Sequence, residues 1–186
     1  MMPVIRINDA TFSDLRSIST WLGTTTPSQT VDKLVRHMMD ELDLERDTGE
    51  EIEQKIQEGG AVEFNSAPGL SFTRVIAASI DGHPISKTNW AGLLIGMIAA
   101  VTKKGLTGQK LVNELQVPAK NSEYTDEGYK YHSDLGISVQ GQAAPDAWKE
   151  VDRLAKKWII PVEVKFQWRD NQKAQHPGQI GVLRSG

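Results

Sequence analysis

The chain opens with a short alternating pattern of apolar and polar residues. Over residues 3–9, Ile5 and Ile7 fall on one side of an extended chain and the residues between them fall on the other. Alternation with a period of two is typical of a strand that is buried on one face only. We therefore predict a short half-buried strand, and its second face consists of Val4, Arg6 and Asn8.

Two helical patterns follow the predicted strand. The first begins at Asp9, a candidate N-cap, and ends at Gly23, which suits the left-handed conformation that follows many helices. Its apolar residues recur at helical spacing at Phe12, Leu15, Ile18 and Leu22. This spacing predicts a helix of about three turns.

The second helical pattern has a sharply marked start. Thr26 can cap the helix, Pro27 suits its first position, and Gln29 can close a capping box. Apolar residues then recur every three or four positions, which predicts one wide apolar stripe along the helix. The stripe consists of Val31, Leu34, Val35, Met38, Met39 and Leu42.

The pattern changes from residue 70 onward. Residues 71–81 are rich in β-branched and aromatic residues, which predicts a strand. Residues 90–101 are almost wholly apolar, which predicts a deeply buried helix. Because Gly92 and Gly96 lie four residues apart on that helix, we expect a neighbouring element to approach it closely there.

The last third of the chain predicts further strands and one amphipathic helix. Short strands are expected over 129–132 and 135–140, and a helix with an apolar stripe begins near Pro145. Residues 162–168 alternate strictly, so one face of that strand is expected to be buried and the other wet, with Glu163, Lys165, Gln167 and Arg169 on the wet side. The fold class predicted for this region is α+β, with a mostly antiparallel sheet and helices on one face.

Composition and charge divide the chain into parts. The 186 residues are 39% hydrophobic and include no cysteine, which excludes disulfides, thiolate metal sites and cysteine nucleophiles. Residues 1–60 hold 6 basic and 12 acidic side chains, whereas residues 61–186 hold 15 and 12. An acidic stretch that ends in two glycines is typical of a solvated spacer. We predict an N-terminal module over 1–44, an acidic linker or helix extension over 45–60, an α+β domain over 61–169, and a loosely attached polar tail over 170–186.

No segment indicates a membrane or secreted protein. Apolar runs such as residues 91–101 are much shorter than the roughly 20 residues that cross a bilayer. The N-terminus also lacks a charged segment followed by an apolar stretch and a cleavage site. We expect a cytoplasmic protein with no membrane partner.

In order and size, the N-terminal module resembles the ribbon-helix-helix family of dimeric DNA-binding proteins, the Arc- and MetJ-type repressors. The resemblance rests on residues 4–8 as the strand, 9–22 as the first helix, and 26–31 as the start of the second. One strand and two helices are near the lower size limit for independent folding, so a second copy of the chain is also the economical way to bury them.

The resemblance implies how DNA is bound. In this family two strands pair into an antiparallel ribbon that enters the major groove, so Val4, Arg6 and Asn8 are expected to contact base edges. The amino end of the second helix holds a phosphate, with Thr26 and Ser28 beside it. Residues 1–42 hold 4 basic and 5 acidic side chains. We therefore expect weaker or more cooperative binding, or phosphate contacts from the other domain.

Other candidate chemistry is weaker. Glu163 and Lys165 have the Glu-x-Lys spacing of many metal-dependent nucleases, with Asp134 the only weak candidate for a further carboxylate. The turn over 105–110, with Lys103, Lys104 and Lys110, could offer amides and cations to a phosphate, but a plain turn between helices is the favoured interpretation. His132 with Asp134, and the three tyrosines at 124, 129 and 131, are more simply explained as turn and strand residues.

The leading prediction is therefore a sequence-specific DNA-binding regulator that is not an enzyme. Its family resemblance implies a transcriptional repressor, often autoregulatory, with double-stranded DNA and a second copy of itself as partners. The C-terminal domain is expected to serve oligomerisation, a ligand or a protein partner. No cofactor or metal is predicted. The alternatives are a metal-dependent nuclease targeted to DNA by its N-terminal module, and a dimeric adaptor that does not bind DNA.

Overall fold

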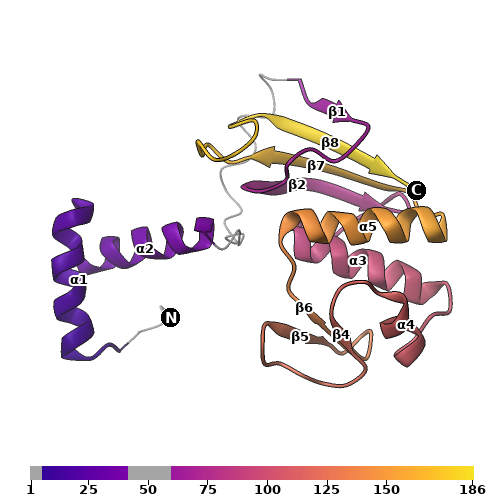
Figure 1. Ribbon diagram of the computed structural model, residues 1–186, viewed down its shortest axis with the longest axis horizontal. Coiled ribbons are helices and arrows are strands. Elements are labelled where there is room, and N and C mark those ends of the chain that lie inside the picture. The colour runs from indigo at the N-terminus through magenta and orange to yellow at the C-terminus, as the bar shows by residue number, and fades with distance from the viewer. Residues whose placement is uncertain (1–5, 42–59) are drawn as a thin grey trace. The chain divides into compact units, whose positions relative to one another are not determined.

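The computed structural model describes residues 6–41 and 60–186 of the chain. The chain divides into two compact units, Met1–Arg46 and Asp47–Gly186, called here the N-terminal unit and the C-terminal unit. The described part of the N-terminal unit is helical, and the C-terminal unit combines helices with two sheets (Figure 1). The protein is therefore α+β, as its sequence predicts.

The N-terminal unit contains α1 (Asp9–Leu22) and α2 (Pro27–Glu41). α1 ends at Gly23, which takes the predicted left-handed conformation with φ 63°. Its N-cap, however, is Asn8 and not Asp9, because the Asn8 Oδ1 atom accepts a hydrogen bond of 2.8 Å from the Thr11 amide. Asp9 instead occupies the first turn, where a carboxylate is favoured by the helix dipole.

The larger sheet of the C-terminal unit has five strands in the order β1-β8-β7-β2-β3. The pairing of β1 with β8 is parallel and the other pairings are antiparallel, so the sheet is mixed. The strands are β1 (Val62–Phe64), β2 (Thr73–Ile80), β3 (His83–Pro84), β7 (Val162–Trp168) and β8 (Ile180–Ser185).

The segment predicted to be a loosely attached polar tail contains β8, so that prediction is wrong for residues 180–185. β8 lies between β7 and β1, and its Ile180 and Leu183 are buried. A Cβ atom at Gly181 would lie 2.5 Å from the Phe166 ring, so this position requires glycine for the two strands to pack. β8 is stabilised by its pairing with a strand on each side. The polar residues around it in the sequence give no sign of this pairing.

The wet face predicted for β7 is only partly wet. Glu163 is exposed and Lys165 is intermediate, but Gln167 is buried. The Gln167 Oε1 atom accepts a 2.8 Å hydrogen bond from Arg74 on β2, and its Nε2 atom donates to the Gly178 carbonyl. A long amide side chain can therefore be buried on this face because each end has a partner.

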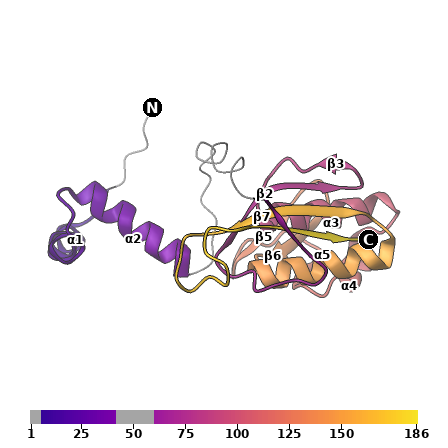
Figure 2. The same ribbon diagram turned by 90° about the horizontal axis from the view of Figure 1, so that it is seen from above.

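Two helices cover one face of the five-stranded sheet. α3 (Trp90–Lys103) and α5 (Ala144–Trp158) lie side by side beneath β2, β7 and β8 in both views (Figures 1 and 2). The core between helices and sheet includes several side chains with almost no exposure. Among them are Leu93, Met97, Ile98, Val151, Leu154, Val164, Phe166 and Trp168.

The close approach predicted at Gly92 and Gly96 is present. A Cβ atom at Gly92 would lie 2.3 Å from the Lys87 carbonyl oxygen, and one at Gly96 would lie 2.9 Å from Ile80. Substituting Gly92 would displace the backbone at Lys87, which follows β3, and substituting Gly96 would displace the side chain of Ile80 at the end of β2. These glycines therefore fix the spacing between α3 and the segment from Ile80 to Lys87.

A second, three-stranded antiparallel sheet has the order β4-β6-β5. It comprises β4 (Ala119–Lys120), β5 (Tyr129–His132) and β6 (Ile137–Gln140). The Lys120 Nζ atom lies 3.0 Å from the ring centroid of Tyr124 and 4.6 Å from that of Tyr129. Tyr124 and Tyr129 thus make intramolecular cation–π contacts with Lys120.

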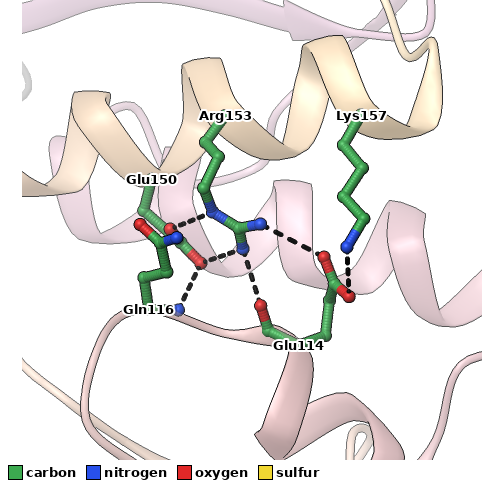
Figure 3. A network of polar contacts seen from close by, with 5 residues as sticks. All are labelled: Glu114, Gln116, Glu150, Arg153 and Lys157. Atoms are coloured by element: carbon green, nitrogen blue, oxygen red, sulfur yellow. Dashed lines mark hydrogen bonds and ion pairs between the residues drawn. The ribbon is translucent and has the colours of Figure 1, made fainter.

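A polar network joins the short helix α4 (Gly108–Glu114) to α5 (Figure 3). The guanidinium of Arg153 donates 2.8 Å hydrogen bonds to both carboxylate oxygens of Glu150, and it also donates to the Glu114 carbonyl and carboxylate. Lys157 donates to the other Glu114 carboxylate oxygen, and the Gln116 amide donates to Glu150. Every member of the network therefore has a charged or polar partner.

The network fixes the charge state of Glu114. Burial acts to raise the pKa of Glu114, but hydrogen bonds from Lys157 and Arg153 and their positive charges outweigh it and lower the pKa below its usual value. A carboxylate whose pKa is lowered by folding stabilises the fold above its unfolded pKa, and this contribution is lost as the pH falls through the lowered value. The network is thus a stabilising feature at neutral pH.

Candidate functional site

The described part of the N-terminal unit has little core of its own. α1 and α2 pack against each other around Leu15, which is 7% exposed, and around the buried Thr30 hydroxyl, which lies 2.6 Å from the Thr24 hydroxyl. In contrast, Val35 is 42% exposed and Met38 is 55% exposed. Among residues 6–41, the large apolar side chains left exposed are Ile7, Phe12, Trp21, Val31, Val35 and Met38.

The described part of the predicted ribbon strand, residues 6–8, is not a strand in the single chain. Val4 lies outside the described residues. A two-stranded ribbon obtains its ladder of hydrogen bonds only from a second chain, so one chain by itself has no partner for these residues. The Arg6 side chain is exposed, and Asn8 uses its carbonyl oxygen to cap α1.

The start of α2 has the predicted cap at Thr26, but the Gln29 side chain bonds to Thr25 and not to the Thr26 amide that a capping box would use. The Gln29 amide donates a 3.3 Å hydrogen bond to the Thr26 hydroxyl, while the Gln29 Oε1 atom accepts from both the amide and the hydroxyl of Thr25. Thr26 therefore works as the cap, and its hydroxyl already has a partner. Ser28 is also exposed, and its amide and hydroxyl have no hydrogen bond within the described ranges, so both groups are open to solvent.

The C-terminal unit holds a groove that sequence reasoning missed. It has a volume of about 630 Å³ and runs along the exposed side of α3, between the β2–β3 hairpin and the β5–β6 hairpin. Its floor is apolar and includes Leu94, Ile95, Ala99, Val139 and Ile160. These residues are separated by up to 66 positions in sequence (Leu94 to Ile160), so no local pattern brings them together.

The rim of the groove is cationic. Lys87, Lys103, Lys104 and Lys130 line it, against Asp81 and Asp134. None of the four lysines forms an ion pair within residues 6–41 and 60–186. Lys103 and Lys104 belong to the basic turn that the sequence singled out, whereas Lys110 does not line the groove.

His132, the last residue of β5, and Asp134, in the turn between β5 and β6, also line the groove. Burial lowers the pKa of His132, and the positive charges of Lys130 and Lys87 lower it further, while Asp134 acts in the opposite direction. Two lysines are therefore close enough to His132 to act on it electrostatically. At neutral pH we expect the imidazole to be uncharged.

The residues proposed for a nuclease centre are not brought together. Glu163 accepts a 2.6 Å hydrogen bond from Arg184, which also pairs with Glu63 on β1. Asp134 belongs to the other sheet region and lines the groove, which does not include Glu163. In the part of the chain that the structure describes, no group of three or more histidine, aspartate or glutamate residues is placed to hold a metal ion.

Comparison with known proteins identifies no relative. No protein-family model, no curated protein and no solved structure matches the chain. None of the helices within the described ranges is long and apolar enough to cross a membrane.

Proposed function

We propose that the protein is a sequence-specific DNA-binding regulator that dimerises through its N-terminal unit. The observation that carries the proposal is the exposed apolar surface of α1 and α2, in particular Phe12, Val31, Val35 and Met38. Such a surface in so small a unit indicates an interaction site, because exposed apolar side chains are costly to hydrate.

A second copy of the chain is the occupant that fits this surface best. A unit of two helices cannot bury enough apolar area to be stable alone. In a two-fold dimer the same patch meets itself, so each apolar residue is covered by an identical surface. Pairing of residues 3–8 with the same segment of the partner would complete the strand at the same time.

The chemistry of the proposed ribbon suits the major groove. Arginine can donate two parallel hydrogen bonds to guanine, and a valine side chain can contact a thymine methyl group. Because the Asn8 Oδ1 atom caps α1, only the amide NH₂ group of Asn8 remains free to contact a base. Arg6 is therefore the residue expected to contribute most to sequence discrimination.

The start of α2 supplies a phosphate contact beside the ribbon. The outward-facing amide and hydroxyl of Ser28 lie at the positive end of the helix dipole, where phosphates bind. The Thr26 hydroxyl accepts from Gln29, so its contribution is to hold the cap in shape. With the resemblance to Arc- and MetJ-type proteins, this arrangement favours a repressor among DNA-binding regulators.

The test is the binding of the full-length protein to DNA sites selected from a pool of random duplexes. We expect Arg6→Ala to weaken binding to the selected site roughly 100-fold, because each bidentate contact to guanine contributes about 1–3 kcal/mol and the dimer loses two. Binding to unselected DNA should change much less. Arg36→Ala removes the same charge from an exposed ion pair on α2 and is the matched control.

Four outcomes would contradict the proposal. Equal binding of the wild-type protein to all duplexes would exclude sequence readout, and an unchanged affinity in Arg6→Ala would exclude readout by the ribbon. A dimer that binds no DNA would support the adaptor alternative instead. Nicking of plasmid DNA in magnesium that is abolished by Glu163→Ala would support the nuclease.

A further inference from the structure

The groove along α3 is a second surface that the proposed function does not use. It lies entirely within the C-terminal unit and combines an open apolar floor with a rim of lysines that form no ion pair with any residue that the structure describes. Surface lysines are ordinarily solvated or paired with a nearby carboxylate. Four lysines around one apolar depression, with only two aspartates beside them, give the groove a local excess of positive charge.

The floor of the groove is formed by small and branched apolar residues. Ala91, Ile95 and Ala99 recur every four residues on the exposed side of α3, and Ala100 completes that side. Val139 of β6 and Ile160 after α5 close the floor from the opposite side. The glycine contacts at 92 and 96 hold the β2–β3 hairpin against α3, so one wall is fixed by tight packing and the groove is preformed.

The volume and charge of the groove define its ligand. A cavity of about 630 Å³ lies within the range of roughly 300–1,000 Å³ found for sites that bind small organic molecules. The residues of the floor are apolar, and Ser86, Asn89, Gln140 and Gln142 also line the groove. The body of the ligand is therefore mainly apolar. Lys87 and Lys130 stand near the half-buried His132 at one part of the rim, and Lys103 and Lys104 stand at the end of α3.

We propose that this groove binds a small organic anion, with an aromatic or aliphatic body on the floor of α3 and a carboxylate, sulfonate or phosphate at the Lys87–Lys130 part of the rim. Lysine ammonium groups on flexible stems can reach an acid group in several positions. Asp81 and Asp134 also line the rim, but the four lysines outnumber them, so the net charge of the rim stays positive. The inference concerns the C-terminal unit and holds whether or not the N-terminal unit binds DNA.

The test uses two dyes that share one ring system. The first, 8-anilinonaphthalene-1-sulfonate, carries one negative charge, and the second, N-phenyl-1-naphthylamine, lacks the sulfonate. Both become fluorescent at apolar sites, so titration of the full-length protein with each dye measures affinity for the apolar body with and without the anion. We expect saturable binding of both dyes, with the sulfonate bound about tenfold more tightly.

Variants locate the site and its charge. Replacing Lys87 and Lys130 with glutamine should weaken binding of the sulfonate about tenfold and leave the neutral dye unchanged. Lys149→Gln removes an exposed lysine of α5 outside the groove and should change neither dye. Ala99→Trp should fill the floor and weaken both dyes. Circular dichroism and thermal unfolding establish that each variant is folded, and the glutamine substitutions replace surface side chains only.

The proposal is overturned by any of three results. Equal affinity for the charged and the neutral dye would remove the anion from the ligand class. Sulfonate binding that is unaffected by the Lys87 and Lys130 substitutions would place the dye elsewhere. The third result comes from competition for the bound sulfonate dye. If oligothymidylate or polyglutamate displaces the dye at a lower concentration than 1-naphthoate does, the groove belongs to a nucleic acid or an acidic peptide. If 1-naphthoate displaces the dye at the lowest concentration of the three, the proposal is supported.

Discussion

Val35→Asp is expected to convert the protein from a dimer to a monomer and to abolish specific DNA binding. Val35 lies on α2 with 42% of its surface exposed in the single chain, and in the proposed dimer this surface is covered by the partner. A two-fold interface would receive two unpaired carboxylates. Since burying an unpaired charge costs several kcal/mol, the dimer dissociation constant should rise about 1,000-fold or more.

Analytical ultracentrifugation of the full-length protein over a range of concentrations measures this change. His37→Asp is the matched control, because residue 37 is exposed and lies about 200° around α2 from residue 35. That variant gains the same charge on the opposite side of the helix and should remain dimeric. A wild-type protein that is monomeric at all concentrations, or a Val35→Asp variant that dimerises normally, would show that the apolar surface of α2 is covered in another way.

Arg153→Met is expected to lower the free energy of unfolding of the C-terminal unit by about 3–5 kcal/mol, the usual cost of breaking a buried ion pair by removing one partner. Glu150 is only 3% exposed, and Arg153 donates to both of its carboxylate oxygens. Without the guanidinium, the buried carboxylate keeps only the hydrogen bond from the Gln116 amide. The carbonyl of Glu114 also loses its donor.

Chemical denaturation followed by tryptophan fluorescence provides the measurement. Lys156→Met removes an exposed cation that pairs with Asp152 on the same helix, and it should cost less than about 0.5 kcal/mol. Adding Glu150→Leu to Arg153→Met should recover much of the lost stability, because no buried charge then lacks a partner. If Arg153→Met lowers the free energy of unfolding no more than Lys156→Met does, the network contributes little to stability.

The effect of Arg153→Met also has a predicted pH dependence. Arg153 is one of two cations that lower the pKa of Glu114 against the opposing effect of burial. This part of the stability is present above the ordinary glutamate pKa of about 4.3 and is lost as the pH falls through the lowered pKa. The difference in stability between wild type and variant should therefore be largest near neutral pH and should narrow in acid.

Local signals in the sequence were reliable where the side chains that act are neighbours along the chain. Gly23 marked the end of α1 and Thr26 with Gln29 marked the start of α2, because caps depend on contacts within a few residues. The end of α5 shows the limit of such signals. There Ile159 takes the left-handed conformation with φ 52°, which a branched residue seldom adopts and no local pattern indicates.

Features that depend on distant residues could not be predicted in the same way. β8 was missed because its stability comes from pairing with other strands and not from its own composition. Its partner β7 lies more than 10 residues away in the sequence, and its partner β1 lies more than 110 residues away. The strands β3 and β4 have two residues each, too few for a periodic pattern. The groove along α3 likewise combines side chains from two hairpins and a helix, and only the folded chain brings its lysines to one rim.

The central claim is that residues 3–8 of two chains pair as an antiparallel ribbon, and a cysteine scan tests it most directly. The chain has no cysteine, so single cysteines placed in turn at positions 3 to 8 of the full-length protein report only their own contacts. In a two-fold antiparallel ribbon, one residue lies directly opposite the same residue of the partner chain. The Cα atoms of these two residues are then about 4.5–5.5 Å apart, which is within reach of a disulfide. The account predicts rapid disulfide-linked dimers at that position and slower formation on either side. Uniformly slow cross-linking at all six positions would contradict it.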